Sequence, residues 1–434
     1  RDVAPSRGLG DVYKRQLKAH LLNHIFENNY FFINYFMKVL YLGCFCEPTT
    51  MPLINKRTKG RISVSATTFQ RALLHGYDKL EYKPNYIVNV PDIGSFPMRC
   101  SSPFFPRSKF EFASMKGVNG AFFNFTYIKK YSIYRSIIKE STEWLDLHSK
   151  EKVTILVYSV IYPYLKAAID LKYKYPNVEV CCIVLDLPEY FGDNTSWFCR
   201  ILGKKITNQI YALVPEIDSF VLLTEHMKDK LNVGFRPWHL LEGVYNPIEV
   251  TSQKKRKKVI LYTGKLDTRF GIRDLIAAFN EIDDKEFSLW ICGFGLDQPF
   301  VEVAAKNDSR IIYWGLVEQN RVFEMQQQAT LLVNPRKGDA EFTKYSFPSK
   351  TMEYMASGTP TVMYKLPGLP ADYEEHLVLI PDNSRETFTA VLKEWGNKEQ
   401  VELDEFGKHA RQFILENKNS EIQAKRLMNF IMQH

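Results

Sequence analysis

Short apolar runs alternate with stretches of helical periodicity through the first half of the chain. A buried strand has no polar face, so it shows an unbroken apolar run, whereas a surface helix repeats apolar residues about every three to four positions. The runs that fit strands are Met37–Leu42, Tyr86–Val90, Thr154–Ser159, Val178–Leu185, Phe220–Leu223 and Trp238–Leu241. The stretches that fit helices are Ile62–His75, Tyr131–His148 and Ile161–Tyr173. This alternation predicts an α/β domain with a parallel sheet, interrupted by an irregular, aromatic-rich excursion over Pro91–Lys130.

The same alternation begins again at Val259 and continues to the C-terminus. Predicted strands are Val259–Thr263, Phe287–Cys292, Ile311–Trp314, Thr330–Val333 and Thr361–Tyr364. Predicted helices are Gly271–Ile282, Pro299–Ala305, Arg321–Gln328, Lys350–Ser357, Ser384–Trp395 and Asp404–Met432. The pattern therefore predicts a second α/β domain of similar size, and the 434 residues are enough for two.

Two changes in composition mark the predicted boundaries. Residues 251–258 (TSQKKRKK) are polar and basic, which is typical of a solvated linker, with a contact to lipid head groups as the alternative. Residues 1–36 precede the first methionine, which opens a strand, so we expect them to be a non-native or disordered extension. The predicted organisation is a first domain over 37–250, the linker over 251–258, a second domain over 259–419 and a final helix over 420–434.

Charge and missing motifs narrow the class of function. The net charge of +8 favours anionic partners, which include nucleic acid, acidic lipids and phosphorylated small molecules. The basic residues form no nucleic-acid-binding signature, so we expect no nucleic-acid partner. The chain also lacks a GxxxxGK[ST] phosphate loop, an HExxH motif, a GxSxG elbow and a CxxC pair. No Asp-x-Asp sequence occurs, so we predict no metal site.

The densest group of polar residues, NPRKGDAEFTKYSFPSKTMEYMASGTPTV, follows the predicted strand Thr330–Val333. Ser349 is predicted to cap the next helix, and N–H groups at a helix N-terminus bind anions such as a diphosphate. Lys350 lies unfavourably in the first turn unless an anion is present. Glu353 lies one turn later on the same face, where a carboxylate suits a ribose diol. The alternative is a capped helix with a surface Lys–Glu pair.

Basic residues also follow the first strand of the second domain, in the sequence YTGKLDTRFG. Lys265 and Arg269 come shortly after Gly264, at the carboxyl end of the strand. Basic groups at this position suit the neutralisation of a phosphate. A solvated polar loop is the alternative interpretation.

Two further strand ends of the second domain are candidates for contacts with the same ligand. Gly293 and Gly295 indicate a tight turn, although the sequence lacks the third glycine of a dinucleotide fingerprint. Trp314, Leu316 and Val317 form an apolar strand end that could hold a planar base. Core packing explains Trp314 equally well.

In the first domain, polar residues follow two of the predicted strands. Gly43 ends the first strand, and Asp186 and Glu189 follow the strand Val178–Leu185. Ligands of open parallel sheets bind at the carboxyl ends of the strands. These residues are therefore predicted to form an acceptor side that faces the second domain, with solvated loop carboxylates as the alternative.

Three segments resemble glycosyltransferase family 4, which has the GT-B fold of two facing Rossmann-like domains and a C-terminal helix that crosses back to the first. The segments are VLLTEHMKDKL, YTGKLDTRFGIRDLIAAF and YSFPSKTMEYMASGTPTV. The last is similar to the donor loop of bacterial capsule and exopolysaccharide transferases. The resemblance covers most of Met37–His434 and is strongest over Val221–Glu374.

The resemblance implies a retaining transfer from a nucleotide sugar, with a UDP-sugar favoured over a GDP-sugar and without a metal or other cofactor. It implies a saccharide or polyprenyl-diphosphate-linked saccharide as acceptor in surface polysaccharide synthesis. Lys265 corresponds to the donor-phosphate arginine of the family and Glu353 to its ribose-binding glutamate. The backbone that cradles the diphosphate and sugar corresponds to Ser346, Phe347, Pro348 and Ser349.

The sequence departs from the family at two positions. Phe270 replaces a phosphate-binding lysine, so we expect Lys265, Arg269 and Lys350 to be the catalytic cations, with Arg336 beside them. Tyr345 stands where the family has its first glutamate. The nearest upstream glutamate is Glu341, which we include in the donor site.

Three alternatives are weighed against this function. The first keeps the fold but changes the chemistry, as a sugar-nucleotide epimerase or a phosphorylase does, although the sequence shows no pyridoxal lysine context for a phosphorylase. The second is a non-catalytic GT-B partner subunit without turnover, and the third, a nucleic-acid-binding protein, lacks a supporting signature. We expect a cytoplasmic protein, at the inner face of the plasma membrane if the aromatic segment Phe104–Lys130 lies on lipid. A buried aromatic core is the alternative for that segment.

Overall fold

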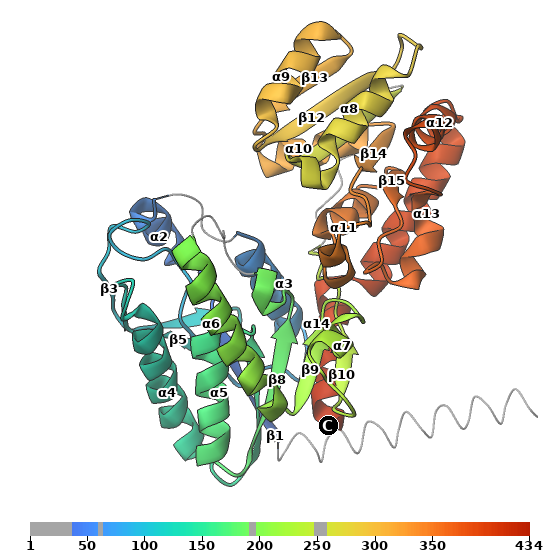
Figure 1. Cartoon of the computed structure of the whole chain (residues 1–434). Coiled ribbons are helices and arrows are strands. Elements are labelled where there is room, and N and C mark those ends of the chain that lie inside the picture. Colours follow the sequence, from blue (N-terminus) through green and yellow to red (C-terminus); the bar gives the residue numbers. More distant parts are fainter. Residues whose placement is uncertain (1–36, 60–63, 191–196, 247–257) are drawn as a thin grey trace, which may run out of the picture.

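The computed structural model describes residues 37–59, 64–190, 197–246 and 258–434, apart from the side chains of 64 and 197–202 (Figure 1). The predicted extension over 1–36 and all of the predicted linker except its last residue lie outside the described residues. That last residue, Lys258, pairs with Asp284 and Glu286 at 2.5 and 2.8 Å.

The first domain is built on an eight-stranded sheet with the order β10-β9-β8-β7-β1-β2-β5-β4. Its strands are β1 (Met37–Gly43), β2 (Tyr86–Asn89), β4 (Ser108–Phe112), β5 (Met115–Asn119), β7 (Lys152–Tyr158), β8 (Val178–Val184), β9 (Ser219–Leu222) and β10 (Trp238–Leu240). Its helices are α2 (Met51–Arg57), α3 (Val64–Asp78), α4 (Lys129–Leu147), α5 (Tyr162–Lys174), α6 (Trp197–Leu213) and α7 (Met227–Lys230). Every neighbouring pair is parallel except β4–β5, which confirms the predicted parallel sheet.

The excursion over Pro91–Lys130 was predicted to be irregular, and this is wrong in part. It contains the hairpin β4–β5, with Ala113 at φ 53° in its turn, and a small ribbon of β3 (Phe104–Phe105) and β6 (Phe122–Phe123). These edge strands are short and half-exposed, so they show no unbroken apolar run. Helix α2 has only seven residues, so it shows too little of the helical period to be recognised, and helix α6 was also missed.

The second domain has a six-stranded parallel sheet with the order β13-β12-β11-β14-β15-β16. Its strands are β11 (Val259–Lys265), β12 (Ser288–Phe294), β13 (Ile311–Gly315), β14 (Leu331–Asn334), β15 (Thr361–Tyr364) and β16 (Val378–Ile380). Its helices are α8 (Ile272–Asn280), α9 (Gln298–Asn307), α10 (Gln319–Gln328), α11 (Ser349–Ala356), α12 (Arg385–Gly396) and α13 (Gln400–Asn417). The strand order reverses between β11 and β14, and this reversal is where ligands of open α/β sheets bind.

The C-terminal segment was predicted to be helical over Asp404–Met432, with a separate final helix over 420–434, and the structure has the break between the two helices at Lys418 and Asn419. Helix α13 ends at Asn417, and Asn419 then caps α14 (Ser420–Gln433) by accepting a bond from the N–H of Ile422. Helix α14 lies against α3 of the first domain (Figure 1). A side chain at Gly76 would come within 2.0 Å of the Ser420 carbonyl oxygen, so this glycine permits the close contact.

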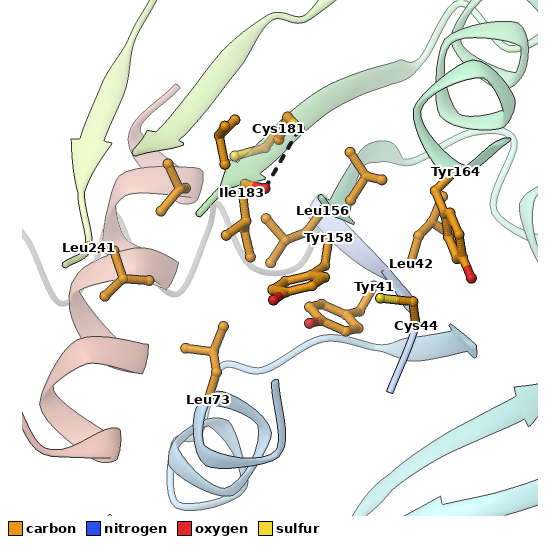
Figure 2. Packing of buried hydrophobic residues seen from close by; sticks show 14 of the residues in the cluster. Tyr41, Leu42, Cys44, Leu73, Leu156, Tyr158, Tyr164, Cys181, Ile183 and Leu241 are labelled. Atoms are coloured by element: carbon orange, nitrogen blue, oxygen red, sulfur yellow. Dashed lines mark hydrogen bonds between the residues drawn. The ribbon is translucent and has the colours of Figure 1, made fainter. Parts of the chain in front are cut away.

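The described residues form two large hydrophobic cores. In the first, Tyr41 of β1, Tyr158 of β7 and Leu73 of α3 lie near one another between the sheet and the helix (Figure 2). The same cluster includes Met355 of α11 and Leu427 of α14, so it extends across the domain boundary. The second core lies within the C-terminal domain, between its sheet and helices such as α8 and α12.

Polar contacts also join the faces of the two domains. The Thr224 hydroxyl donates to the Lys344 carbonyl oxygen at 2.8 Å, and a ring nitrogen of His226 lies 2.9 Å from the Pro367 carbonyl oxygen. The rings of Tyr190 and Tyr345 stack across the same boundary at 6.3 Å. The chain therefore folds as two doubly wound α/β domains that face each other.

Candidate active site

A pocket of about 270 Å³ opens where the strand order of the second sheet reverses. Its walls come from the end of β11, the end of β14 and the start of α11. The lining residues are Tyr262, Thr263, Gly264, Lys265, Phe270, Val333, Asn334, Arg336, Phe347, Pro348, Ser349, Lys350 and Tyr354. We call it the C-domain pocket. It brings together the predicted residues of two loops that are separated by about 70 positions in the sequence.

Three cationic side chains line this pocket. Lys265 is exposed at the end of β11, and Lys350 donates a long hydrogen bond of 3.4 Å to the hydroxyl of Thr263. Arg336 is 6% exposed, and its burial lowers the pKa of the guanidinium to about 10. It therefore stays protonated at neutral pH. The pocket concentrates positive charge in a small space, as an anionic ligand requires.

Helix α11 begins at the floor of the pocket, but its start differs from the prediction. Ser349 is the first helical residue, and the N-cap position is taken by Pro348, which makes no side-chain capping bond. Pro348 cannot cap because it has no side-chain acceptor. The first N–H groups of α11 therefore have no capping side chain, and a helix N-terminus in this state attracts an anion.

Arg269 does not line the pocket. Its guanidinium forms a bidentate pair with the buried carboxylate of Asp267, at 3.0 and 2.8 Å. This pair is the main reason that the pKa of Asp267 is lowered to about 2. The charge of Arg269 is therefore paired with Asp267 within the β11–α8 loop. Arg336, and not Arg269, lines the pocket.

Glu353 faces helix α10 and is not among the residues that line the pocket. The side-chain amide of Gln326 donates to its carboxylate at 2.7 Å. Its neighbour Tyr354 does line the pocket, and sequence analysis did not single it out. The Tyr354 hydroxyl accepts from the N–H of Thr263 at 2.8 Å and donates to the carbonyl oxygen of Thr263 at 3.0 Å. Tyr354 thereby joins α11 to the end of β11.

The two predicted glycines shape the loops behind the pocket. A side chain at Gly293, which has φ 142°, would meet the carbonyl oxygen of Gly264 at 1.8 Å. One at Gly295 would meet the carbonyl oxygen of Leu266 at 2.1 Å. Both positions therefore require glycine so that the β12 loop can lie against the β11 loop.

The apolar strand end of β13 lies outside the C-domain pocket. Trp314 is 44% exposed and packs edge-to-face on Trp290. Leu316 is exposed, whereas Val317 packs against the small cluster around Trp290. The structure therefore leaves part of the Trp314 ring accessible for a planar group.

The segment η4 (Glu341–Tyr345) carries two residues that were predicted to belong to the donor site, Glu341 and Tyr345. Glu341 is exposed, and Tyr345 points toward the first domain, where it stacks on Tyr190. Ser346 points back toward the pocket, and its hydroxyl accepts a bond from Arg336 at 2.6 Å. This segment therefore joins the C-domain pocket to the opposite domain.

The first domain has its own pocket, of about 650 Å³, at the carboxyl ends of β1, β7 and β8. We call it the N-domain pocket. Asp186 and Glu189 line it, but Gly43 does not, because Gly43 is buried against the rings of Tyr41 and Phe45. Its lining also includes residues that sequence analysis did not single out for this pocket, among them Asp92, Lys130, Ser159, Tyr162 and Lys204.

The two carboxylates of the N-domain pocket have different surroundings. Burial raises the pKa of Asp186. Glu189 accepts a hydrogen bond from Tyr211 at 2.8 Å and pairs with Lys230 at 3.3 Å. The ammonium of Lys230 also lies 5.9 Å from the centroid of the Tyr345 ring. Glu189 is therefore held in place near the domain boundary, whereas Asp186 keeps free hydrogen-bonding capacity inside the pocket.

The stacked pair of Tyr190 and Tyr345 connects the neighbourhoods of the two pockets. Tyr190 follows Glu189 of the N-domain pocket, and Tyr345 precedes Ser346 and Phe347, beside the C-domain pocket. Two doubly wound domains with ligand pockets on facing strand ends define the GT-B class of fold.

Comparison with known proteins supports this class. Residues 257–396 match the family model described as "Glycosyl transferases group 1". No curated protein is significantly similar to the chain in sequence.

Solved structures of the same fold align over almost the whole chain. A sucrose-phosphate synthase from Thermosynechococcus elongatus has 15% identity and a TM-score of 0.58, and the match covers 91% of this chain and 98% of that one. HepE from Anabaena, solved with UDP, has 11% identity, a TM-score of 0.57 and coverage of 92% and 100%. An α,α-trehalose-phosphate synthase (UDP-forming) from Burkholderia xenovorans has 10% identity, a TM-score of 0.60 and coverage of 92% and 100%. The fold is GT-B, and the family match with this fold indicates a glycosyltransferase.

Groups of metal ligands and helices that could span a membrane bear on the remaining expectations. Across the described ranges, no three His, Cys, Asp or Glu side chains are grouped as metal ligands would be. In the same ranges, no helix is long and apolar enough to cross a membrane. Metal independence and membrane contact both stay predictions.

Proposed function

We propose that this glycosyltransferase moves a sugar from a nucleotide-sugar donor, with retention and without a metal, to a saccharide or polyprenyl-diphosphate-linked saccharide in surface polysaccharide synthesis. One observation supports the donor site above all. The C-domain pocket places Lys265, Arg336 and Lys350 around the uncapped N-terminus of α11. A diphosphate is the part of a nucleotide sugar that fits cations and N–H groups in this arrangement.

The same groups account for the chemistry. Negative charge grows on the leaving diphosphate as its bond to the sugar breaks. Preorganised cations and helix N–H groups stabilise that charge more in the transition state than in the ground state, and in many enzymes such stabilisation contributes most of the rate enhancement. Retention and metal independence rest on the resemblance to family 4. A UDP-sugar is the favoured donor and a GDP-sugar the alternative.

The N-domain pocket is the proposed acceptor site. Asp186 and Glu189 can accept hydrogen bonds from saccharide hydroxyls, and the ring of Tyr162 and other apolar side chains suit the C–H faces of a sugar. Lys130 and Lys204 also line this pocket and suit the phosphate of a lipid-linked acceptor. This set of groups favours an amphipathic acceptor that carries phosphate.

An exposed aromatic surface adjoins this pocket and is the proposed membrane contact. It consists of Phe104, Phe123, Phe125, Tyr127, Ile128 and Tyr131, all of which are exposed. Lys130, within the same segment, lines the N-domain pocket. Aromatic side chains with nearby cations suit the head-group region of an anionic bilayer.

The donor assignment is tested by thermal stabilisation of residues 37–434 with UDP, GDP, ADP and their common sugar conjugates. We expect one nucleotide class to stabilise the protein, and we expect Lys350→Gln to lose most of this shift. The control is Lys365→Gln, an exposed lysine that pairs with Glu374 at 2.8 Å. No shift with any nucleotide, from folded protein, would contradict the proposal.

Product analysis separates transfer from the other functions. Incubation with the stabilising nucleotide sugar and bacterial lipid extract should yield a glycosylated product, and its anomeric NMR coupling tests retention. Unchanged product formation in EDTA tests metal independence. Conversion of the donor sugar to an epimer, without transfer, would instead support an epimerase. Binding without any turnover would support a non-catalytic partner subunit.

A further inference from the structure

Arg336 is a buried cation without a carboxylate partner. It follows β14 directly, and only 6% of the residue is exposed. Among the described residues, no Asp or Glu oxygen forms an ion pair with it. One Nη donates to the hydroxyl of Ser346 at 2.6 Å, and the buried Nε has no hydrogen-bond partner in the described structure.

Two aromatic rings flank the guanidinium. Its central carbon lies 4.4 Å from the ring centroid of Phe342 and 5.8 Å from that of Phe270. Stacking of this kind suits the flat guanidinium and orients it. It does not neutralise the charge or satisfy the free Nε–H.

Such a buried charge is costly by itself. Removal of a charged group from water is unfavourable unless a partner of opposite charge or a full set of hydrogen bonds replaces the water. The lowered pKa of Arg336 reflects this cost, and its only cause is burial. The protein nevertheless keeps the arginine charged at neutral pH, and it faces a pocket rather than a carboxylate.

The surroundings of Arg336 point to the missing partner. The same pocket contains Lys265, Lys350 and the first N–H groups of α11, so it favours an anion with several oxygens. Phe270, one of the two flanking rings, occupies the position where the resembled family has a lysine for phosphate. The side chain that replaces the lysine therefore positions another cation.

We propose that Arg336 supplies the phosphate-binding charge that Phe270 lacks, and that its guanidinium binds the diphosphate of a nucleoside diphosphate donor through the free Nε–H and a neighbouring Nη–H. This inference rests on the proposed donor function. Arginine presents a planar pair of N–H groups that matches two phosphate oxygens. The phosphate-binding charge is thus carried by Arg336 in the loop after β14, and Phe270 in the loop after β11 carries none.

The test compares Arg336→Gln with Lys337→Gln. Lys337 is the adjacent cation, but it pairs with Asp274 at 3.2 Å and does not line the pocket. Affinities for UDP, GDP and ADP, each beside its nucleoside, are measured by calorimetry or competition, and thermal stability is recorded without ligand. For the diphosphate that binds the wild type, Arg336→Gln should weaken binding at least about tenfold. Its affinity for the nucleoside should change less than about twofold, because the nucleoside has no phosphate.

The measured affinities decide whether Arg336 binds the diphosphate. Loss of diphosphate binding alone, with Lys337→Gln unchanged, supports the proposal. Equal loss of diphosphate and nucleoside binding would instead assign Arg336 a structural role through Ser346. Unchanged diphosphate binding would also overturn the proposal while leaving the donor function intact. If the wild type binds no nucleoside diphosphate, both proposals fail.

A second variant covers a folding defect in Arg336→Gln. Arg336→Lys keeps the charge but not the planar pair of N–H groups. It should retain part of the diphosphate affinity and bind more weakly than the wild type. An affinity equal to that of the wild type would contradict the proposed two-point contact.

Discussion

The ammonium of Lys418 lies 2.5 Å from the carboxylate of Glu242, and both residues are almost fully buried between the two domains. Glu242 follows the last strand of the first sheet, and Lys418 lies in the break between α13 and α14. Tyr373 donates a second hydrogen bond to Glu242 at 2.9 Å, and Asp372 lies 2.8 Å from Lys418. This buried network holds the point where the chain returns from the second domain to the first.

Removal of one partner of this pair should destabilise the whole protein. Glu242→Gln leaves the Lys418 charge buried with only the half-exposed Asp372 beside it, so we expect a loss of about 3 kcal/mol. Urea or thermal unfolding measures the effect. Lys365→Gln, which breaks an exposed pair, should cost less than about 1 kcal/mol. A Glu242→Gln protein as stable as the wild type would show that the network carries no net stability.

Gly271 should tolerate no side chain, for two reasons. Its φ of 79° lies in the left-handed region, and a Cβ would come within 2.0 Å of the carbonyl oxygen of Pro335. Gly271→Ala must therefore push apart the loop that carries Phe270 and the loop that carries Pro335 and Arg336, and it should lose donor binding together with stability. Gly234→Ala is the matched control, because φ is 63° there but no atom lies near the added carbon. The control should cost about 1 kcal/mol, and Gly271→Ala clearly more.

Replacement of Asp186 should raise the stability of the protein and lower its transfer activity. Burial raises the pKa of its carboxyl, so the folded state binds this proton more tightly than the unfolded state. Its contribution to stability is therefore largest at low pH and is lost as the pH rises through the folded pKa. Asp186→Asn removes this loss and should stabilise the protein at pH 7 while transfer to the acceptor falls, and the gain should be small because Asp186 is exposed to solvent in the pocket.

The pH dependence gives the control for Asp186→Asn. Below the ordinary aspartate pKa the wild-type carboxyl is neutral in both states, so the stability difference should close there. Denaturant unfolding at several pH values measures this difference. A variant that is less stable than the wild type at pH 7 would contradict the assigned cost of burial.

Asp267 should have the opposite pH dependence. Its pKa is lowered to about 2, chiefly by the hydrogen bonds from Arg269, so its stabilisation is complete above the ordinary aspartate pKa of 3.8. It is then lost as the pH falls toward 2. Because Arg269 is largely exposed, we expect the contribution to be only about 1 kcal/mol. The stability difference between wild type and Asp267→Asn should shrink over this acidic range, and parallel curves would contradict the pairing.

The exposed aromatic surface should bind anionic lipid. Replacement of Tyr127 and Tyr131 by Ser removes two of its most exposed rings and should reduce sedimentation with vesicles that contain phosphatidylglycerol. Phe235→Ser is the control, since Phe235 is fully exposed beside β10, at the opposite edge of the sheet from β4. Equal binding by both variants, or no binding by the wild type, would refute this contact.

The sequence by itself predicted most of the fold. Central strands such as Met37–Leu42 and Val178–Leu185 are buried on both faces, so their apolar runs report burial directly. The hairpin β4–β5 was missed because β4 is short and partly exposed, so it shows no unbroken apolar run. The strand ends also pointed to the loops that line the C-domain pocket, because ligands of parallel sheets bind at such ends.

Only the tertiary structure decided what each charged side chain contacts. Arg269 and Arg336 look alike in the sequence, yet the first pairs with Asp267 and the second is buried in the C-domain pocket. Likewise, Glu353 faces Gln326, whereas its neighbour Tyr354 lines the pocket. Periodicity reports whether a residue is buried within its own element. The partner of a buried group depends on how distant segments pack, and that is determined only when the whole chain folds.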